Sequence, residues 1–365
     1  KGVFESMEEY EIRNFVMELE GTYYGDPDDP KRLALQWSNV KRATSAIKTI
    51  AKQRYGTGFF RRSDRGVAFK DVFVTADARH AGLEVRPHSP ENRARQYVDV
   101  EFAGEPRCDR FINFLASLYK HDDDRDKKIQ FIKEFMGASL FGFAVDRHKA
   151  VLLLGRGANG KSQLVNIIKS IMPEGSVSSV PPTGMDDEYN RAELAGVRLN
   201  VVSDMPEEAI LHSNSFKQIV AGDMINAREP YGSPFQYEPE AAHMFAPNTL
   251  PSVRDVSSGF WRRWILVTHN RVFKENPDPN NPREGARTRN IAERILREER
   301  ADILKWAAEG ARETLERQKY TLPPSSEEAI QEWKELSNPL LRWIEMCCEE
   351  VESPGYGGDD WTMAS

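Results

Sequence analysis

Hydrophobic residues in the N-terminal part of the chain recur mainly at the three- and four-residue spacing of amphipathic helices. This spacing predicts a helix over residues 12–19, a second over 33–55 and two more within 110–143. Residues 59–102 place short apolar groups between turn residues and are expected to be rich in strands. The charged run at 121–128 separates the last two helices, and we expect it to form a solvated turn.

From residue 149 the pattern changes to short, almost wholly apolar runs that alternate with longer amphipathic segments. The runs cover residues 151–154, 199–203, 243–247 and 264–268. Continuous apolar strands that alternate with helices are typical of a parallel sheet with helices on both faces. The pattern therefore predicts an α/β core. A helix over 291–315 follows it, then a linker that begins at Pro323-Pro324 and an acidic helical tail over 330–351.

With 365 residues, the chain is long enough for two or three domains. We expect a mixed helical and strand-rich N-terminal domain over residues 1–107, the α/β domain over 108–320 and the acidic tail over 321–365. Because the chain starts at Lys1 and its last residues carry no closing structural signal, we expect a fragment whose tail leads to a missing module.

The composition excludes several classes of protein. A content of 39% hydrophobic and 29% charged residues excludes collagen-like, mucin-like and wholly disordered chains. No apolar run approaches the roughly 18 residues of a transmembrane helix, and no signal peptide opens the chain, so we expect no membrane association. Three cysteines, two of them adjacent, cannot form a disulfide framework, which favours a reducing compartment.

The formal net charge of −7 conceals a segregation of charge along the chain. Residues 1–30 hold nine acidic and two basic residues, whereas residues 31–70 hold eleven basic residues and a single acid, Asp64. The basic block over 31–70 also contains aromatic residues, a combination that suits single-stranded nucleic acid because bases stack on aromatic rings. The block is also compatible with a solvated helix face that balances the acidic N-terminus of a neighbouring subunit.

The strongest motif fits the pattern G-x-x-x-x-G-K-[ST] and directly follows the apolar run at 151–154. Its residues are Gly155, Arg156, Gly157, Ala158, Asn159, Gly160, Lys161 and Ser162. Glycines in such a loop let backbone N–H groups point into a phosphate-sized hollow at the start of the next helix. Lys161 is expected to reach the β- and γ-phosphates of a nucleotide, and the Ser162 hydroxyl to coordinate Mg²⁺. A coincidental glycine-rich turn is the alternative.

A nucleotide site also needs a carboxylate on an adjacent strand, which holds Mg²⁺ or orients the attacking water. The strand expected at 199–203 leads into Asp204, at the carboxyl end where ligand sites of α/β proteins form. Glu207 follows shortly after and is a second candidate. Asp204 is alternatively a turn or capping residue before Pro206.

Two further segments place polar groups next to strands. Asn248 follows the run at 243–247 and is a candidate contact to the γ-phosphate or its attacking water, although Pro-Asn is also common turn chemistry. Arg262 and Arg263 lie among aromatic residues before the last apolar run. A planar guanidinium suits the charge of a transferring phosphoryl group, and a neighbouring subunit can donate it. Alternatively, both arginines stack on tryptophan or pair with acids.

Residues 216–238 predict a helix that breaks at Gly222-Asp223, followed by a β-hairpin whose tip lies at 231–234. In a ring-shaped motor, such a tip could project into the channel and touch a strand of nucleic acid.

Taken in order, these segments resemble superfamily 3 helicases, and more narrowly the helicase part of the primase-helicases of phages, plasmids and large DNA viruses. The resemblance covers roughly residues 60–320. It rests on the phosphate loop, Ser203-Asp204-Met205-Pro206-Glu207, the segment from Lys217 through Gly222-Asp223 to Arg228, Asn248-Thr249-Leu250-Pro251, and the segment from Gly259 to Arg263.

Two departures from the family pattern leave residue roles open. The acid after Ser203 is usually glutamate in the family but is Asp204 here, so the resemblance leaves open whether Asp204 or Glu207 would activate the water. Arg262 and Arg263 are both present, and the family pattern favours Arg263 as the arginine finger.

The resemblance implies an AAA+-like P-loop ATPase that binds ATP and Mg²⁺ and assembles as a ring, commonly a hexamer, on single-stranded DNA. It implies 3′-to-5′ translocation and duplex unwinding during replication, beside a primase or polymerase module, in the cytoplasm of a bacterial host. Lys161 and Ser162 would hold phosphates and Mg²⁺, Asp204 would also hold the metal, Asn248 would sense the γ-phosphate and Arg263 would act on the next subunit. The implied DNA contacts are Lys217, Arg228, Tyr231, Gly232 and Ser233.

Two other functions stay compatible with the sequence. One is a P-loop kinase that needs no ring, against which the arginine pair and Asn248 argue. The other is a non-motor ATP switch that assembles at a replication origin, which would use the same ATP site.

Overall fold

The computed structural model describes residues 9–20, 23–26, 29–33, 40–43, 45–47, 65–77, 82–203, 205, 210–211, 214–255, 257–338, 347–350 and 361–363. Asp204, Glu207 and most of the basic block over 31–70 lie outside these ranges. Within them, no helix combines the length and apolar character that crossing a bilayer requires.

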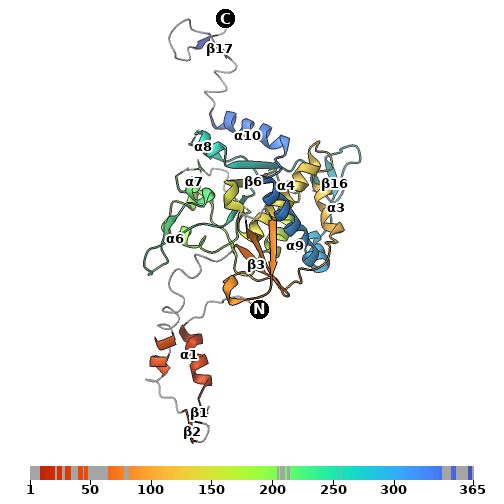
Figure 1. The fold of residues 1–365 in the computed structure, drawn as a ribbon. Helices are drawn as coiled ribbons and strands as arrows, with labels where there is room; N and C mark the ends of the chain where they lie inside the picture. Colours follow the sequence, from red (N-terminus) through yellow and green to blue (C-terminus); the bar gives the residue numbers. More distant parts are fainter. Residues whose placement is uncertain are drawn as a thin grey trace.

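The four predicted apolar runs form strands of one parallel sheet at the centre of the structure (Figure 1). A fifth strand, which the sequence did not indicate, extends the sheet at one edge. The order across the sheet is β14 (Trp264–Thr268), β6 (Ala150–Leu154), β12 (Ala242–Phe245), β8 (Leu199–Val202) and β7 (Val177–Ser178). This arrangement confirms the predicted α/β core.

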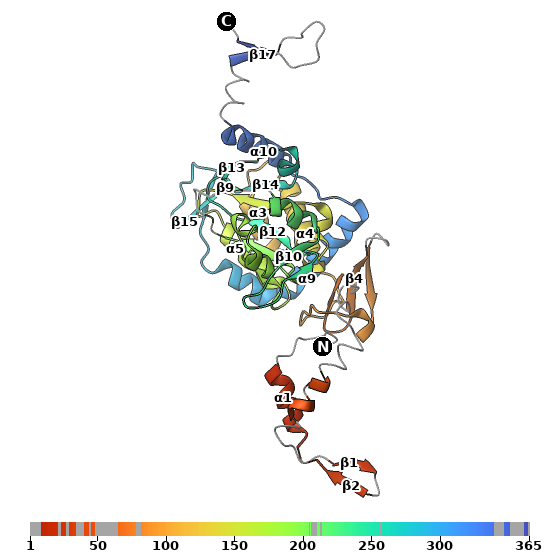
Figure 2. The ribbon, with the colours of Figure 1, turned by 90° about the vertical axis from the view of Figure 1, so that its left-hand side faces the viewer.

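Alternate residues of the strands face opposite sides of the sheet, and each side is covered by its own helices (Figure 2). Val151 and Leu153 of β6 pack with α3 (Asp109–Leu118), α4 (Arg125–Phe141), α5 (Lys161–Ile171) and α9 (Ile291–Arg317). Ala150 and Leu152 pack with α7 (Asn214–Ala221), α8 (Ser258–Trp261) and α10 (Pro324–Ser337). Burial on both faces explains why β6 is apolar at every position.

Helix α10 corrects the prediction of a linker at Pro323-Pro324. Pro324 is the first residue of the helix, where the fixed φ of proline and its missing N–H are tolerated. The helix packs along the edge strand β14, and its Trp333 is completely buried. The hydroxyl of Ser326 accepts a hydrogen bond of 2.9 Å from the backbone N–H of Leu266. The segment is therefore part of the core.

The charged run at 121–128 forms the predicted turn over 121–124 and then the start of α4, and most of its side chains are exposed, but one is buried. Lys128, in the first turn of α4, is completely buried. Its Nζ lies 2.8 Å from a carboxylate oxygen of Asp122 and donates to the hydroxyl of Thr268 at 2.9 Å. A buried ammonium group needs such partners because leaving it unpaired is costly.

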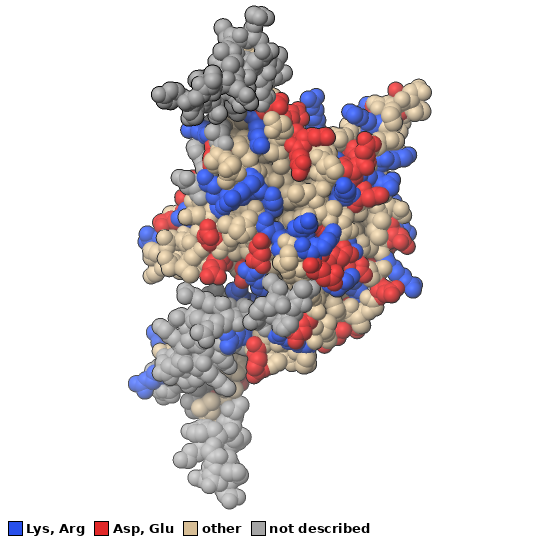
Figure 3. Space-filling model, turned by 45° about the horizontal axis from the view of Figure 1, so that its top comes forward, with Lys and Arg blue, Asp and Glu red and all other residues tan. Residues whose placement is uncertain are grey.

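The remaining elements form smaller units. An antiparallel sheet of β3 (Gly66–Ala68), β4 (Phe73–Asp77) and β5 (Gly82–Arg86) packs beside α9 (Figure 2). The others are α1 (Glu9–Glu18), β1 (Tyr23–Asp26), β2 (Asp29–Arg32), α6 (Glu188–Ala192), β9 (Ile210–Leu211), β10 (Ile225–Ala227), β11 (Phe235–Tyr237), β13 (Ser252–Val253), β15 (Val272–Lys274), β16 (Glu284–Ala286), β17 (Cys348–Glu350) and β18 (Trp361–Met363). On the face drawn in Figure 3, basic and acidic side chains are intermingled, so neither sign covers it alone.

Candidate nucleotide-binding site

The motif at 155–162 forms the loop between β6 and α5, as predicted. Gly157, Ala158 and Gly160 have φ values of 102°, 48° and 81°, in the left-handed region that glycine adopts without strain. Gly160 caps the N-terminus of α5, so N–H groups of the loop and of the first helical turn lie close together. A methyl group built on Gly157 would meet no atom within 4 Å, which leaves room for a phosphate beside this peptide.

Lys161 is buried at the base of this loop, with 5% of its surface exposed. Its Nζ donates to the carbonyl oxygens of Gly155 and of Pro247, the latter at 3.1 Å, and to Oδ1 of Asn248 at 3.3 Å. All these partners are neutral oxygens. Burial lowers the pKa of Lys161 to about 8, because it disfavours the charged ammonium form.

Asn248, an exposed residue just past the end of β12, joins this site as the sequence led us to expect.

The strand leading to Asp204, β8, was expected to be the direct neighbour of β6, and it is not. β12 separates β8 from β6, so the acid-bearing strand is not adjacent to the strand that enters the phosphate loop. Asp204 and Glu207 themselves lie outside the described residues.

The structure gives a partial view of the residues that would hold Mg²⁺. Ser162 is exposed in the first turn of α5, directly after Lys161. Nowhere in the described ranges do three or more His, Cys, Asp or Glu side chains gather into a metal site. A hydroxyl supplemented by phosphate oxygens suits Mg²⁺, which keeps water and substrate oxygens among its ligands.

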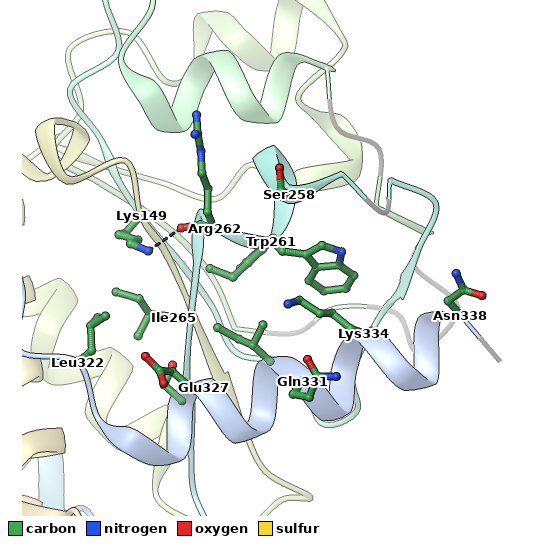
Figure 4. Close-up of a pocket in the computed structure, with 13 residues that line it drawn as sticks. Lys149, Ser258, Trp261, Arg262, Ile265, Leu322, Glu327, Gln331, Lys334 and Asn338 are labelled. Carbon is green, nitrogen blue, oxygen red and sulfur yellow. Dashed lines mark hydrogen bonds between the residues drawn. The ribbon is translucent and has the colours of Figure 1, made fainter. Parts of the chain in front are cut away.

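The two arginines differ in exposure. Arg263 is 8% exposed, and its Nη1 donates to the carbonyl oxygen of Gly259 in the same chain. Arg262 is exposed, and its carbonyl oxygen accepts from Nζ of Lys149 at 2.5 Å. Figure 4 shows the Arg262 side chain pointing away from α10, at the rim of a cavity of about 760 Å³. Another molecule can therefore reach Arg262 directly. The family pattern, by contrast, favours Arg263 as the arginine finger.

The arginine pair and the phosphate loop lie at opposite ends of the strands: the arginines at the amino ends and the loop at the carboxyl ends. The arginines precede Trp264, which pairs in parallel with Ala150, the first residue of β6. The loop follows Leu154, the last residue of the same strand. A strand of this length spans about 16 Å at roughly 3.3 Å per residue. Neither guanidinium therefore lies beside the phosphate loop of its own chain.

The predicted hairpin is present, with β10 and β11 paired from Ile225–Tyr237 to Ala227–Phe235. Tyr231 at its tip is fully exposed and has a φ of 60°. Nε of Arg228 donates to the carbonyl oxygen of Gly232 at 3.1 Å and closes the tip, and Ser233 is exposed beside it.

Lys217, the fifth residue assigned to DNA, is not part of this tip. It lies on α7, where its Nζ pairs with a carboxylate oxygen of Asp255 at 2.9 Å. A phosphate contact by Lys217 would have to compete with this ion pair.

Sequence reasoning missed a buried histidine beside the phosphate loop. His269 directly follows β14, and its backbone N–H donates to the carbonyl oxygen of Leu154 at 2.7 Å. The signal was available, because the carboxyl ends of parallel strands meet at one edge of the sheet. The rule that singled out Asp204 and Asn248 applies equally to His269.

Comparison with known proteins gives a family match and one sequence relative. Residues 153–263 match a family of unknown function, DUF5906. The chain is 24% identical over 266 residues to the "Putative helicase" of Acanthamoeba polyphaga mimivirus, a match that covers 67% of this chain and 26% of that protein. The chain thus spans about a quarter of the length of this relative.

The fold is similar to that of the C-terminal region of NrS-1. One apo structure of that region has a TM-score of 0.50 at 14% identity and covers 94% of this chain and 78% of the other. A second apo structure has a TM-score of 0.50 at 12% identity, with coverage of 93% and 78%. The likeness shows a shared α/β fold, a parallel sheet between helices.

Proposed function

We propose that this chain is the motor part of an ATP-dependent DNA helicase of superfamily 3, assembled as a ring, commonly a hexamer. The observation that carries the proposal is the placement of a phosphate loop and an arginine pair at opposite ends of the strands of one sheet. In a ring of identical chains, the surface that carries the arginines in one copy can meet the surface that carries the loop in the next. The sequence similarity to a viral helicase supports the same class.

The donors around the loop suit ATP with Mg²⁺. Among the described residues, Lys161 contacts only neutral oxygens, so a phosphate would supply a counter-charge and raise the pKa of the ammonium group toward its ordinary value. Mg²⁺ held by Ser162 and Asp204 would neutralise charge on the phosphates. Asn248 would contact the γ-phosphate, and Asp204 or Glu207 would orient the attacking water.

An arginine of one subunit would complete the site of the next. Arg262 is the exposed member of the pair, and Arg263 follows it at the same sheet edge. An arginine supplied by a neighbour contributes about 10³-fold or more to the rate of phosphoryl transfer. Isolated monomers should therefore hydrolyse ATP poorly.

Single-stranded DNA would contact the hairpin tip, where Tyr231 is free to stack on a base. We further propose 3′-to-5′ movement, unwinding during replication of a phage, plasmid or virus, and a primase or polymerase partner. These properties follow from the family resemblance, and the bacterial cytoplasm is the matching location.

The decisive experiment measures ATP hydrolysis with and without single-stranded DNA, together with displacement of a labelled strand. We expect DNA-stimulated hydrolysis and unwinding in the wild type and the loss of both in Lys161→Ala. Lys169→Ala is the matched control, because Lys169 is an exposed lysine near the end of the same helix. Unwinding by Lys161→Ala would refute the site. Hydrolysis without strand displacement would replace the motor by a non-motor ATP switch.

A further inference from the structure

His269 packs directly against the phosphate loop. It is 3% exposed and follows the last residue of β14. A methyl group built on Gly155 would lie 2.8 Å from the carbonyl oxygen of His269 and would also collide with the side-chain amide of Asn159. The three residues are therefore packed together with no spare room.

The two ring nitrogens of His269 face different partners. Nε2 is 3.2 Å from the hydroxyl of Tyr119, which is itself fully buried. Nδ1 faces the backbone of Asn159 without a hydrogen bond of normal geometry. Burial lowers the pKa of the imidazole to about 3, so the ring is neutral and carries one proton. The carbonyl oxygen of Asn159 can only accept, so the tautomer with a proton on Nδ1 directs a donor toward it and lets Nε2 accept from Tyr119.

The segment that carries His269 is anchored on both sides of the ring. Before it, the hydroxyl of Thr268 accepts from Nζ of Lys128 at 2.9 Å. After it, Nδ2 of Asn270 donates to Asp122 at 3.4 Å, and Asp122 pairs with Lys128 at 2.8 Å. The buried ion pair thus fixes the backbone around His269. A hydrogen bond from this ring would restrain the loop.

A trans peptide group points its C=O and its N–H in opposite directions. The carbonyl oxygen of Ala158 accepts from the backbone N–H of Phe273 at 2.7 Å, which turns the N–H of Asn159 away from the segment 269–273. We propose that His269 acts on the next peptide: its Nδ1–H holds the carbonyl oxygen of Asn159 and so aims the N–H of Gly160 at a bound phosphate.

His269 is in this view a positioning residue, since it touches no substrate itself. The inference rests on the proposed function, because it requires that the loop binds a nucleotide. It also assigns a task to the ion pair of Lys128 and Asp122, which anchors the residues on either side of His269.

The test separates the two ring nitrogens. In His269→Asn the side-chain amide lies near the place of Nδ1 and keeps a donor toward the loop. In His269→Gln the amide lies near the place of Nε2 and keeps only the contact to Tyr119. We expect His269→Gln to weaken binding of a fluorescent ATP analogue about five- to tenfold, the effect of losing one buried hydrogen bond. His269→Asn should bind like the wild type.

Three outcomes would overturn the inference. Unchanged binding by His269→Gln would show that the contact is unused, and an equal loss in both variants would show that ring packing alone matters. If His269→Gln fails to fold, His269→Asn decides alone, because it keeps the donor toward the loop. A clear loss of affinity in that variant would refute the inference. Failure of the wild type to bind the analogue would instead refute the proposed function.

Discussion

Nζ of Lys161 and Oδ1 of Asn248 lie 3.3 Å apart, although 87 positions separate the two residues in the sequence. Each follows the carboxyl end of a buried strand, and β6 and β12 are parallel neighbours. The sheet thus places an amide oxygen beside the ammonium group of Lys161 at the base of the loop.

Replacement of Asn248 should separate nucleotide binding from turnover. Asn248→Ala removes a contact proposed to act on the γ-phosphate, so we expect kcat for ATP to fall about 10- to 100-fold with little change in affinity. Asn248→Asp should instead weaken binding, because a carboxylate would pair with Lys161 and compete with phosphate. Thr249→Ala, at the exposed next residue, is the control for steady-state assays. Equal kinetics in Asn248→Ala and the control would remove Asn248 from the site.

Mixing of two inactive variants tests whether the arginine acts across a subunit boundary. Lys161→Ala and Arg262→Ala should each reduce ATP turnover about 10³-fold on their own. A mixture should regain measurable turnover, because an intact loop of one chain can meet an intact arginine of the other. Arg263→Ala should lower the melting temperature as well, since Arg263 is buried. If the mixture stays as inactive as its components, the shared site is wrong.

Tyr231 offers a direct test of the hairpin as the DNA contact. Stacking of one base on an aromatic ring contributes about 1–3 kcal/mol, so Tyr231→Ala should weaken binding of single-stranded DNA about tenfold or more. Tyr231→Phe keeps the ring and should bind normally. Fluorescence anisotropy with a labelled oligonucleotide at fixed salt measures both. Comparable affinity in all three proteins would move the DNA contact elsewhere.

Acid should destabilise the fold through a buried histidine. His243 is 1% exposed, its Nδ1 is 3.2 Å from the amide nitrogen of Asn200, and burial lowers its pKa to about 3. The unfolded chain takes up a proton below about pH 6.5 and the folded chain does not. Stability is therefore fully present above that pH and is lost toward pH 3, by about 1.4 kcal/mol per unit for one such group.

Urea unfolding at pH 7.5 and 5.5 checks this dependence. His243→Asn keeps a neutral polar group at the site of Nδ1 and should show a smaller loss of free energy of unfolding between the two pH values. An identical loss in variant and wild type would assign the acid sensitivity to other groups, His269 among them.

The sequence was sufficient for the features that depend on local pattern. Four apolar runs gave four strands, and the glycine-lysine motif gave the loop with Lys161 at the start of a helix. The rule that strand ends meet at one edge brought Asn248 to Lys161. Sequence alone did not give the sheet order, because the insertion of β12 between β6 and β8 depends on pairing between distant segments.

Buried charge was the other feature that local pattern misplaced. A run of acids and lysines such as 121–128 predicts a solvated turn, but Lys128 finds its partners at Asp122 and, far along the chain, at Thr268. Arg262 and Arg263 are identical in type and adjacent, and only the three-dimensional packing of α8 shows which is exposed. Pro323-Pro324 indicated a break where proline starts a helix.

The contact of Ser326 with Leu266 has a consequence for how copies of the chain can associate. An uncovered outermost strand offers a row of backbone groups to which a foreign strand can add, the usual route to aggregation. Here the hydroxyl of Ser326 accepts from the backbone N–H of Leu266 in β14, and helix α10, anchored by the buried Trp333, packs along this strand. Extension of the sheet by strand pairing between two molecules is thereby blocked at β14, so contacts between copies at this edge must use side chains.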